Sequence, residues 1–405
     1  MALDEVNRRA FLKAMGGAGM MTMLPESGLG LRTTESGHFV HEIAGPGQDA
    51  EAKPKDSIRF SVCGMSHDHI YGMVGAVLRG GGVLVAAYGA EPDKAAAFAK
   101  AFPQAKMVQS EGEILDDSST QLVLSSTIPN QRAPLGVRVM KRGKDFLSDK
   151  PGATTLEQLA EVRRTIAETK RVYAIMYSER LEVKGAVKAG ELVQAGAIGR
   201  VIQTINIAPH QIFQPVKAGA DAHAGGASPR PYWFWEPELY GGILCDIGSH
   251  QVDQFLYYTG STEAEVVASQ IANVNHPEHP KFQDFGDMML RGDRGFGYVR
   301  LDWFTPDALG TWGDGRLFIL GTEGYIEVRK YINVAVSKSG NNLFLVNKTE
   351  QRYIDCNNVV LPFGPQFVSD VVNRTHIAQD QAQCLLAAEL VIKAQMKAQV
   401  AHLKS

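Results

Sequence analysis

Short apolar runs alternate with amphipathic runs from residue 57 to residue 176, and this alternation limits the fold more than any other feature of the chain. The apolar runs predict strands at residues 57–63, 83–88, 121–126, 145–148 and 172–176. The runs between them predict helices at residues 68–79, 93–102, 132–142 and 156–169. Strands that alternate with helices pair in parallel through right-handed crossovers. Residues 56–177 are therefore expected to form an α/β domain with a doubly wound parallel sheet, which binds ligands at the carboxyl ends of its strands.

The pattern changes after residue 177, where most strand-like runs follow one another without intervening helices. These runs lie at residues 201–207, 265–271, 285–290, 295–303, 316–321, 324–329 and 333–336. Helices are expected at residues 184–194, 248–258 and 383–403, and a loop rich in Gly, Pro and aromatic residues at 209–239. Strands in succession favour an open, mostly antiparallel sheet. Residues 178–405 are therefore expected to form an α+β domain for substrate binding and oligomerisation, closed by a returning C-terminal helix.

The first 55 residues are interpreted as an export signal followed by a linker. Arg8 and Arg9 precede Phe11, and a short apolar stretch follows at residues 14–24. This layout is typical of a twin-arginine (Tat) signal; the alternative is a basic amphipathic helix with a chance pair of arginines. We expect the Tat export machinery as a partner and a periplasmic or otherwise exported location. The chain has no apolar run of about 18 residues, the length needed to span a membrane.

Charge and cysteine content argue against several classes of function. The chain has 41 Lys and Arg residues against 44 Asp and Glu residues, a formal net charge of -3. No basic excess therefore points to nucleic acid or to an anionic membrane. The cysteines match no zinc spacing and no C-x-x-C motif; they are Cys63, Cys245, Cys356 and Cys384. We expect buried thiols, although an oxidising compartment would also allow pairing.

The segment after the first predicted strand departs from the usual dinucleotide turn, which carries three glycines as G-x-G-x-x-G. Gly64 fits the first position, whereas Ser66 and His69 stand at the second and third. Ser66, His67 and His69 remain candidate contacts to the nucleotide. The two histidines could instead hold a metal or pack locally, and we expect no metal centre. Glu91, after the second strand, is the candidate acid for the adenosine ribose or else a solvated loop charge, so NAD and NADP both stay open.

Two separated segments carry residues suited to alcohol oxidation. Lys150 follows the strand at 145–148, at the sheet edge where a parallel sheet binds its ligand. Asp246 and His250 are four residues apart at the start of a predicted helix and so project from one face. Histidine titrates near neutral pH and suits the base that takes the hydroxyl proton. A carboxylate can orient the imidazole, and an ammonium can polarise the oxygen.

These segments resemble the glucose–fructose oxidoreductase / inositol dehydrogenase / rhizopine-catabolism family (Gfo/Idh/MocA), from about residue 58 to residue 404. Residues 143–151 are similar to its segment ending in Glu-Lys-Pro, with Asp149 in place of the glutamate. Residues 241–250 are similar to its glycine-rich D-x-G-x-H segment. The resemblance implies a Rossmann nucleotide domain and a catalytic lysine, aspartate and histidine, which fall on Lys150, Asp246 and His250.

The resemblance also implies the cofactor and its further contacts. Thr127, Pro129 and Asn130 resemble the family's T-P-N turn, with Ile128 inserted, and would contact NAD or NADP together with Lys150. Folded export would require the nucleotide to be acquired beforehand, so we expect it to be tightly bound. The outer face of the second sheet would make a homo-oligomer contact.

Several residues are candidates for contact with a small carbohydrate. Arg230, Trp233 and Trp235 lie in the loop at 225–235, where aromatic rings could stack on sugar faces and arginine could bind hydroxyls. The alternative is a packed loop or a subunit contact. Tyr177 and Arg180 resemble the family's aromatic–arginine segment that leaves the nucleotide domain. His210, after the first strand of the second domain, could reach the same cleft.

Four functions are compatible with these residues. The first is an NAD(P)-dependent oxidoreductase acting on a CH–OH group of a sugar, polyol or glycoside, with C3 of a glucoside as one candidate position. The second is an NAD-dependent glycoside hydrolase that oxidises its substrate transiently and eliminates the aglycone. The third is a sugar sensor, which the presence of a base argues against. The fourth is a metal hydrolase using His67, His69, His276 and His279.

Overall fold

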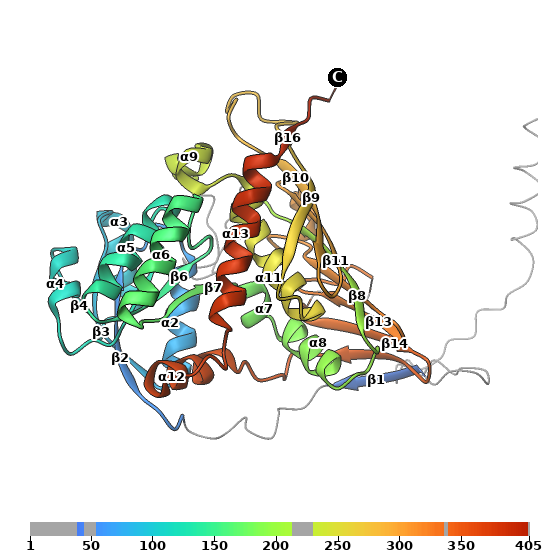
Figure 1. The fold of residues 1–405 in the computed structure, drawn as a ribbon, viewed down its shortest axis with the longest axis horizontal. Helices are drawn as coiled ribbons and strands as arrows, with labels where there is room; N and C mark the ends of the chain where they lie inside the picture. The colour runs from blue at the N-terminus through green and yellow to red at the C-terminus, as the bar shows by residue number, and fades with distance from the viewer. Residues whose placement is uncertain (1–38, 44–53, 213–229, 336–338, 404–405) are drawn as a thin grey trace, which may run out of the picture. The chain divides into compact units, whose positions relative to one another are not determined.

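The computed structural model describes residues 39–43, 54–212, 230–335 and 339–403. Their strands form two sheets, one of six strands and one of ten (Figure 1). The predicted twin-arginine signal and residues 213–229 of the aromatic loop lie outside the described residues. No helix in the described ranges combines the length and the hydropathy that crossing a membrane requires.

The six-stranded sheet is parallel throughout, in the order β4-β3-β2-β5-β6-β7. Its strands are β2 (Ile58–Cys63), β3 (Gly82–Tyr88), β4 (Lys106–Met107), β5 (Leu122–Ser125), β6 (Asp145–Asp149) and β7 (Tyr173–Met176). Its helices are α2 (His69–Arg79), α3 (Pro92–Ala101), α4 (Glu111–Asp116), α5 (Pro129–Lys141) and α6 (Leu156–Thr169). The central strands β5 and β6 are buried at every position, as expected for strands covered on both faces. The predicted doubly wound sheet is confirmed, and its strand order reverses between β2 and β5, where ligands bind in such folds.

The ten-stranded sheet has the order β1-β15-β14-β13-β12-β8-β11-β10-β9-β16. Its strands are β1 (Phe39–Ile43), β8 (Val201–Pro209), β9 (Ala264–Ala272), β10 (Phe285–Gly292), β11 (Phe296–Asp302), β12 (Arg316–Gly321), β13 (Gly324–Arg329), β14 (Asn342–Asn347), β15 (Gln351–Asp355) and β16 (Gln399–Val400). Three of its pairs are parallel, namely β1 with β15, β8 with β11 and β9 with β16. The others are antiparallel, so the predicted mostly antiparallel sheet is confirmed.

Helices cover one face of the large sheet and connect it to the small one. They are α7 (Ser178–Leu181), α8 (Lys184–Gln194), α9 (Pro237–Tyr240), α10 (Ile243–Asp246), α11 (Gly248–Thr259), α12 (Phe363–Asn373) and α13 (Gln381–Lys397), with 3-10 turns η1 (Tyr232–Trp235) and η2 (Asp307–Leu309). The alternation of buried and half-buried residues along β12 and β13 gives the sheet its apolar face. Helix α13 contacts β9 of the large sheet and α6 of the nucleotide domain, so it joins the two halves (Figure 1).

Three predicted elements are wrong in part. The linker at 25–55 contains β1, which pairs with β15 at the edge of the large sheet. The strand predicted at 333–336 is absent among its described residues, because Val334 and Ala335 lie in a turn whose Ala335 N–H donates to the Asn333 side chain. Strands β14 and β15, which were not predicted, follow that turn. The last helix ends at Lys397 rather than at residue 403.

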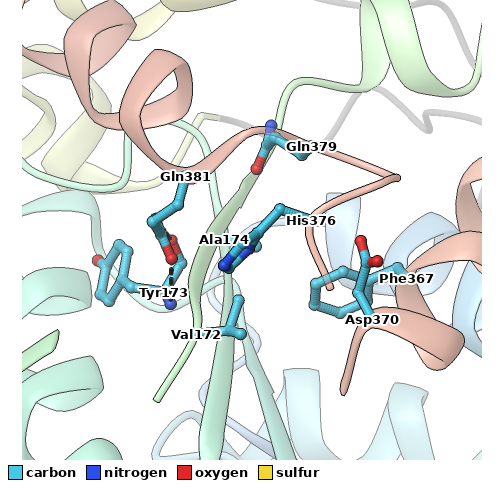
Figure 2. A pocket seen from close by; sticks show the side chains of 8 residues that line it. All are labelled: Val172, Tyr173, Ala174, Phe367, Asp370, His376, Gln379 and Gln381. Carbon is cyan, nitrogen blue, oxygen red and sulfur yellow. Dashed lines mark hydrogen bonds between the residues drawn. The ribbon is translucent and has the colours of Figure 1, made fainter. Parts of the chain in front are cut away.

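Two glutamine side chains complete the edge of the six-stranded sheet at β7. The Gln381 amide accepts from Tyr173 N (3.1 Å) and donates to Tyr173 O (2.7 Å), and Gln379 does the same with Ile175 (3.3 and 3.0 Å). Figure 2 shows Gln379 and Gln381 beside a small cavity that His376 also lines. Its volume of about 10 Å³ is close to the minimum for one water molecule. This cavity is therefore too small for a substrate.

Candidate active site

Lys150 and Asp246 form an ion pair between the two domains. Lys150 directly follows β6, and its Nζ lies 2.7 Å from Oδ1 of Asp246 at the end of α10. Both side chains are largely buried, at 5% and 14% exposure. Burial raises the pKa of the Asp246 carboxyl, but the charge and hydrogen bond of Lys150 outweigh it and bring the pKa below its usual value. The pair is therefore ionised, and the carboxylate holds the ammonium in place.

His250 lies one helical turn after Asp246, in α11, and is buried. Burial lowers its pKa to about 3; the carboxylate of Glu179 opposes this shift, and the charge of Lys150 reinforces it. Its Nδ1 has no hydrogen-bond partner within the described part of the chain. His250 is therefore a neutral imidazole near the Lys150 ammonium, which is the form that can accept a proton. We call Lys150, Asp246 and His250 the catalytic set.

A second group of charged and titratable side chains surrounds Asp149, the last residue of β6. Its Oδ2 lies 2.8 Å from Nδ1 of His67, and its Oδ1 lies 2.9 Å from Nδ1 of His69. Arg132 of α5 also contacts Oδ2 (3.0 Å), and the Lys150 backbone N–H donates to Oδ1 (2.8 Å). We call Asp149, Arg132, His67 and His69 the Asp149 cluster.

The charge and the oxygens of the Asp149 carboxylate are engaged by the other members of the Asp149 cluster. Burial alone would raise the pKa of Asp149, but Arg132 and the two imidazoles hold it well below its usual range. Burial lowers the pKa of His67 to about 4, with His69 contributing. The ligand atoms of His67, His69 and Asp149 lie within 4.8 Å of one another, as in a metal site. The carboxylate takes part in three hydrogen bonds and an ion pair with Arg132, which together engage both of its oxygens.

The turn between β2 and α2 fits a dinucleotide despite its missing glycines. Gly64 has φ of 89°, and a Cβ there would lie 2.6 Å from Cβ of Thr127, so glycine is required. The backbone N–H groups of Ser66, Asp68 and His69 find no acceptor in the described ranges. They lie at the N-terminus of α2, where helices bind phosphate.

The other predicted nucleotide contacts lie along the same edge of the sheet. Ser66 Oγ donates to Glu91 Oε1 (2.5 Å), which places a carboxylate of the β3–α3 turn beside the phosphate turn. Thr127 follows β5, Pro129 is the first residue of α5, and Asn130 comes next. The Asn130 side-chain oxygen is buried without a partner among the described residues.

Two of the predicted substrate contacts, Tyr177 and Arg180, do not reach the carboxyl edge of the six-stranded sheet. Tyr177 is completely buried, and its hydroxyl donates to the backbone oxygen of Cys384 (3.0 Å). Arg180 is buried in a bidentate pair with Asp253 (2.6 and 3.0 Å). Both side chains therefore stabilise the junction between the domains, because their polar groups are already bonded within the protein.

The remaining predicted substrate contacts form an aromatic region beside the catalytic set and the Asp149 cluster. Trp233 lies edge-on to His67, with ring centroids 6.1 Å apart. Trp235 stacks on His279 at 3.7 Å. His210 lies between two tryptophan rings, Trp303 at 5.3 Å and Trp312 at 4.5 Å, and burial lowers its pKa to about 4.

Arg230 holds the described end of the aromatic loop. Its guanidinium donates to the backbone oxygens of Ile212 (2.6 Å) and Gln211 (2.8 Å), and it stacks on Phe234 (4.7 Å). Burial lowers its pKa to about 10. Arg230 is therefore tied through two of its five N–H donors to the backbone at residues 211 and 212.

Two residues that support the site, Arg132 and Glu179, were not predicted from the sequence. Arg132 carries no motif and is recognised only through its contact with Asp149. Glu179 is buried and accepts from Lys330 (2.5 Å) and Gln251 (2.9 Å). Burial would raise the pKa of Glu179, but Lys330 lowers it to about 2, so a carboxylate lies near His250. The four cysteines are buried and unpaired, as expected.

Comparisons with known proteins agree with this architecture. A family model described as an oxidoreductase family with an NAD-binding Rossmann fold matches residues 58–177, and a GFO/IDH/MocA C-terminal domain model matches residues 186–327. The crystal structure of an oxidoreductase from Erwinia carotovora atroseptica SCRI1043 is 45% identical with a TM-score of 0.79, covering 85% of this chain and 100% of that one.

More distant proteins are similar in fold or in part of the sequence. Levoglucosan dehydrogenase in complex with NADH has a TM-score of 0.65 at 17% identity, covering 84% of this chain and 98% of that one. The D-xylose dehydrogenase of Paenarthrobacter nicotinovorans is 27% identical over 137 residues, 34% of this chain and 33% of that protein. The chain thus matches about a third of that relative's length. The two family models and the Erwinia structure together show that the chain is an enzyme of the Gfo/Idh/MocA family of NAD-binding oxidoreductases.

Proposed function

We propose that this protein interconverts a secondary alcohol and a ketone on a sugar, polyol or glycoside, with NAD or NADP as the hydride carrier. The observation that carries the proposal is the Lys150–Asp246 ion pair beside the neutral, buried His250, at the carboxyl edge of the nucleotide sheet. Resemblance to a D-xylose dehydrogenase and a levoglucosan dehydrogenase supports a carbohydrate substrate.

Each member of the catalytic set has one role in this chemistry. When bound, the nicotinamide supplies or accepts a hydride at the alcohol carbon. His250 accepts the hydroxyl proton, because it is neutral and its Nδ1 makes no bond among the described residues that would oppose protonation. Lys150 donates to the developing oxyanion, and Asp246 keeps the ammonium oriented. Trp233 offers a ring face or edge to the sugar.

The nucleotide would be held at the β2–α2 and β3–α3 turns, beside the point where the strand order of the sheet reverses. The free N–H groups of Ser66, Asp68 and His69 would receive the pyrophosphate. Glu91 would accept from the adenosine ribose hydroxyls, and its charge would repel a 2′-phosphate. We therefore favour NAD over NADP.

Localisation and assembly are part of the same proposal. The twin-arginine pattern at Arg8 and Arg9 supports export of the folded protein through the Tat machinery to the periplasm. A homo-oligomer built on the outer face of the ten-stranded sheet stays a prediction.

The first experiment is to denature the purified protein and identify any released nucleotide by mass spectrometry. The protein is then supplied with NAD and a panel of pentoses, hexoses, inositols and glucosides, and reduced nucleotide is followed at 340 nm. We expect NAD to be released and one sugar class to be oxidised. His250→Asn should lower the rate about 1,000-fold, because a positioned general base contributes about 100- to 10,000-fold. No bound nucleotide, no binding of added nucleotide and no turnover would together refute the proposal.

A second candidate is an NAD-dependent glycoside hydrolase, in which oxidation next to the bond to be broken, at C3 of a glucoside for example, is followed by elimination and re-reduction. The observation that favours it is the pair of carboxylate-bound histidines beside the catalytic set, because elimination requires a further base. The products decide between the two. A keto sugar with reduced nucleotide indicates the dehydrogenase, and a free sugar without net redox change indicates the hydrolase.

A further inference from the structure

Two departures from the family's sequence pattern meet in space. His69 stands where the dinucleotide turn normally has its third glycine, and Asp149 stands where the family has glutamate. The structure joins them directly, with His69 Nδ1 2.9 Å from Asp149 Oδ1 and His67 of the same turn bound to Oδ2. The two replacements therefore form one unit that links the β2–α2 turn to the end of β6.

The hydrogen bonds of this unit fix the tautomer of both rings. The fully buried Asp149 carboxylate is ionised, because the paired Arg132 guanidinium holds its pKa well below the usual range and the Lys150 backbone N–H donates to it. An ionised carboxylate only accepts, so Nδ1 of His67 and of His69 must each carry a proton. In the neutral ring, Nε2 then carries the lone pair. A carboxylate that orients a histidine in this way is the usual support for a histidine that accepts a proton.

The His67 and His69 rings both lie close to other residues of the candidate active site. The His69 ring lies 6.4 Å from the His250 ring between centroids, and the His67 ring lies 6.1 Å from Trp233. The His69 side chain is 39% exposed, whereas the Asp149 side chain that holds it is 0% exposed. Oxidation of an alcohol needs one base, and His250 supplies it. The structure thus offers a second imidazole acceptor that hydride transfer does not use.

We propose that His69, oriented by Asp149, is a second catalytic base that removes a carbon-bound proton next to the ketone. This inference rests on the proposed function, which supplies the ketone. His69 is chosen over His67 because its ring is more exposed and lies near His250.

The step conserves atoms and electrons without a further reagent. The bond between hydrogen and the carbon beside the carbonyl breaks, and the proton passes to Nε2 of His69. The electron pair of that bond forms the carbon–carbon double bond of an enolate, and the carbonyl π pair moves to oxygen, where Lys150 donates to the oxyanion. Return of a solvent proton regenerates the ketone. If the next carbon bears a leaving group, the enolate expels it instead, which is the elimination that the hydrolase requires.

The test is exchange of carbon-bound hydrogen with solvent. The full chain is incubated in D₂O with oxidised nucleotide and, one at a time, 2-, 3- and 4-keto hexopyranosides and a keto-inositol. Mass spectrometry and proton NMR then measure deuterium at the carbons beside the carbonyl. In parallel, reduction of the same ketones by reduced nucleotide is measured, and each variant is described by the ratio of exchange to reduction. We expect exchange with at least one ketone that is also reduced, and a ratio about 100-fold lower in His69→Asn, the low end of the contribution of a positioned base.

Three further measurements make the test decisive. Asp149→Asn should also lower the ratio, because an amide cannot hold two Nδ1–H donors and Arg132 in the same way. His402→Asn, in the exposed C-terminal segment, should change neither rate. Reduction of one or more ketones with exchange at none of them, or an unchanged ratio in His69→Asn, would refute the role of His69. Exchange that is lost with chelator and restored by zinc would refute it too, because the imidazoles would then be metal ligands. Absence of reduction with every ketone would instead refute the proposed function.

Discussion

The catalytic set and the Asp149 cluster place neighbouring histidines in two different electrostatic settings. His250 has no carboxylate on its Nδ1, and burial together with the Lys150 charge keeps it neutral. His67 and His69 each have their Nδ1 bound to Asp149, whose own charge is balanced by Arg132. The first setting keeps the ring neutral and leaves its Nδ1 without a partner among the described residues, whereas the second fixes the orientation of the ring. The same residue type is thus adjusted by burial in the catalytic set and by hydrogen bonding in the Asp149 cluster.

Lys150→Met should produce the largest effect, on the side of the catalytic set. It removes the donor to the oxyanion and leaves the buried Asp246 carboxylate without its partner. We expect kcat to fall about 1,000-fold, since a single donor to an oxyanion contributes about 100- to 1,000-fold and Asp246 is also disturbed. Steady-state kinetics with the substrate found by the screen measures this. Activity within tenfold of the wild type would show that the pair is only structural.

Arg132→Met should produce the largest effect on the side of the Asp149 cluster, and that effect is on stability. The substitution removes a guanidinium that is 1% exposed and leaves Asp149 buried with only the imidazoles and one backbone N–H. Breaking a buried ion pair from one side costs about 3–5 kcal/mol. Urea unfolding followed by circular dichroism would measure the loss, with exposed Arg142→Met as the control. A loss under 1 kcal/mol would mean that the histidines alone satisfy Asp149.

A smaller effect, common to both settings, is that the free energy of unfolding depends on pH. The folded-state pKa values of His67 (about 4) and His250 (about 3) are below the ordinary value of 6.5, so the unfolded chain binds protons first as the pH falls. The stability that these neutral rings provide is present above pH 6.5 and is lost as the pH falls toward 4. We expect the free energy of unfolding to decrease steadily between pH 6.5 and 4.5, and His250→Asn to reduce that slope. A flat profile over this interval would contradict the burial of the rings.

The two regions also differ in how far the sequence could predict them. The catalytic set was recognisable because its residues lie in two compact segments with characteristic spacing at a strand end and a helix start. The Asp149 cluster was only partly recognisable. His69 was visible as a departure from a glycine pattern and His67 as its neighbour in an H-x-H sequence, but their partner Asp149 lies about 80 residues away, and Arg132 belongs to no motif. Contacts of that kind are set by the packing of α5 against β6, which local patterns do not encode.

The same limit explains the errors in the fold. Long alternating segments such as 324–329 were predicted with correct bounds, because period-two burial is a local signal. Strand β1 was missed because its pairing with β15 joins residues more than 300 positions apart. Tyr177 and Arg180 were assigned to the substrate because of their family-like position. Their bonds to Cys384 and Asp253 show that a residue at the exit of a strand can equally serve the junction behind the site.

The glutamines at the edge of β7 also affect how exposed this strand is before the protein has finished folding. Side-chain amides at alternate positions present the same donor and acceptor spacing as a backbone, so Gln379 and Gln381 act as a surrogate seventh strand. Gln381 is the first residue of α13 and Gln379 lies two residues before it, so the edge of the nucleotide sheet is covered only when this segment has docked. Until then β7 is an open edge on which another chain can add. A segment more than 200 positions further along the chain therefore protects the first domain from aggregation.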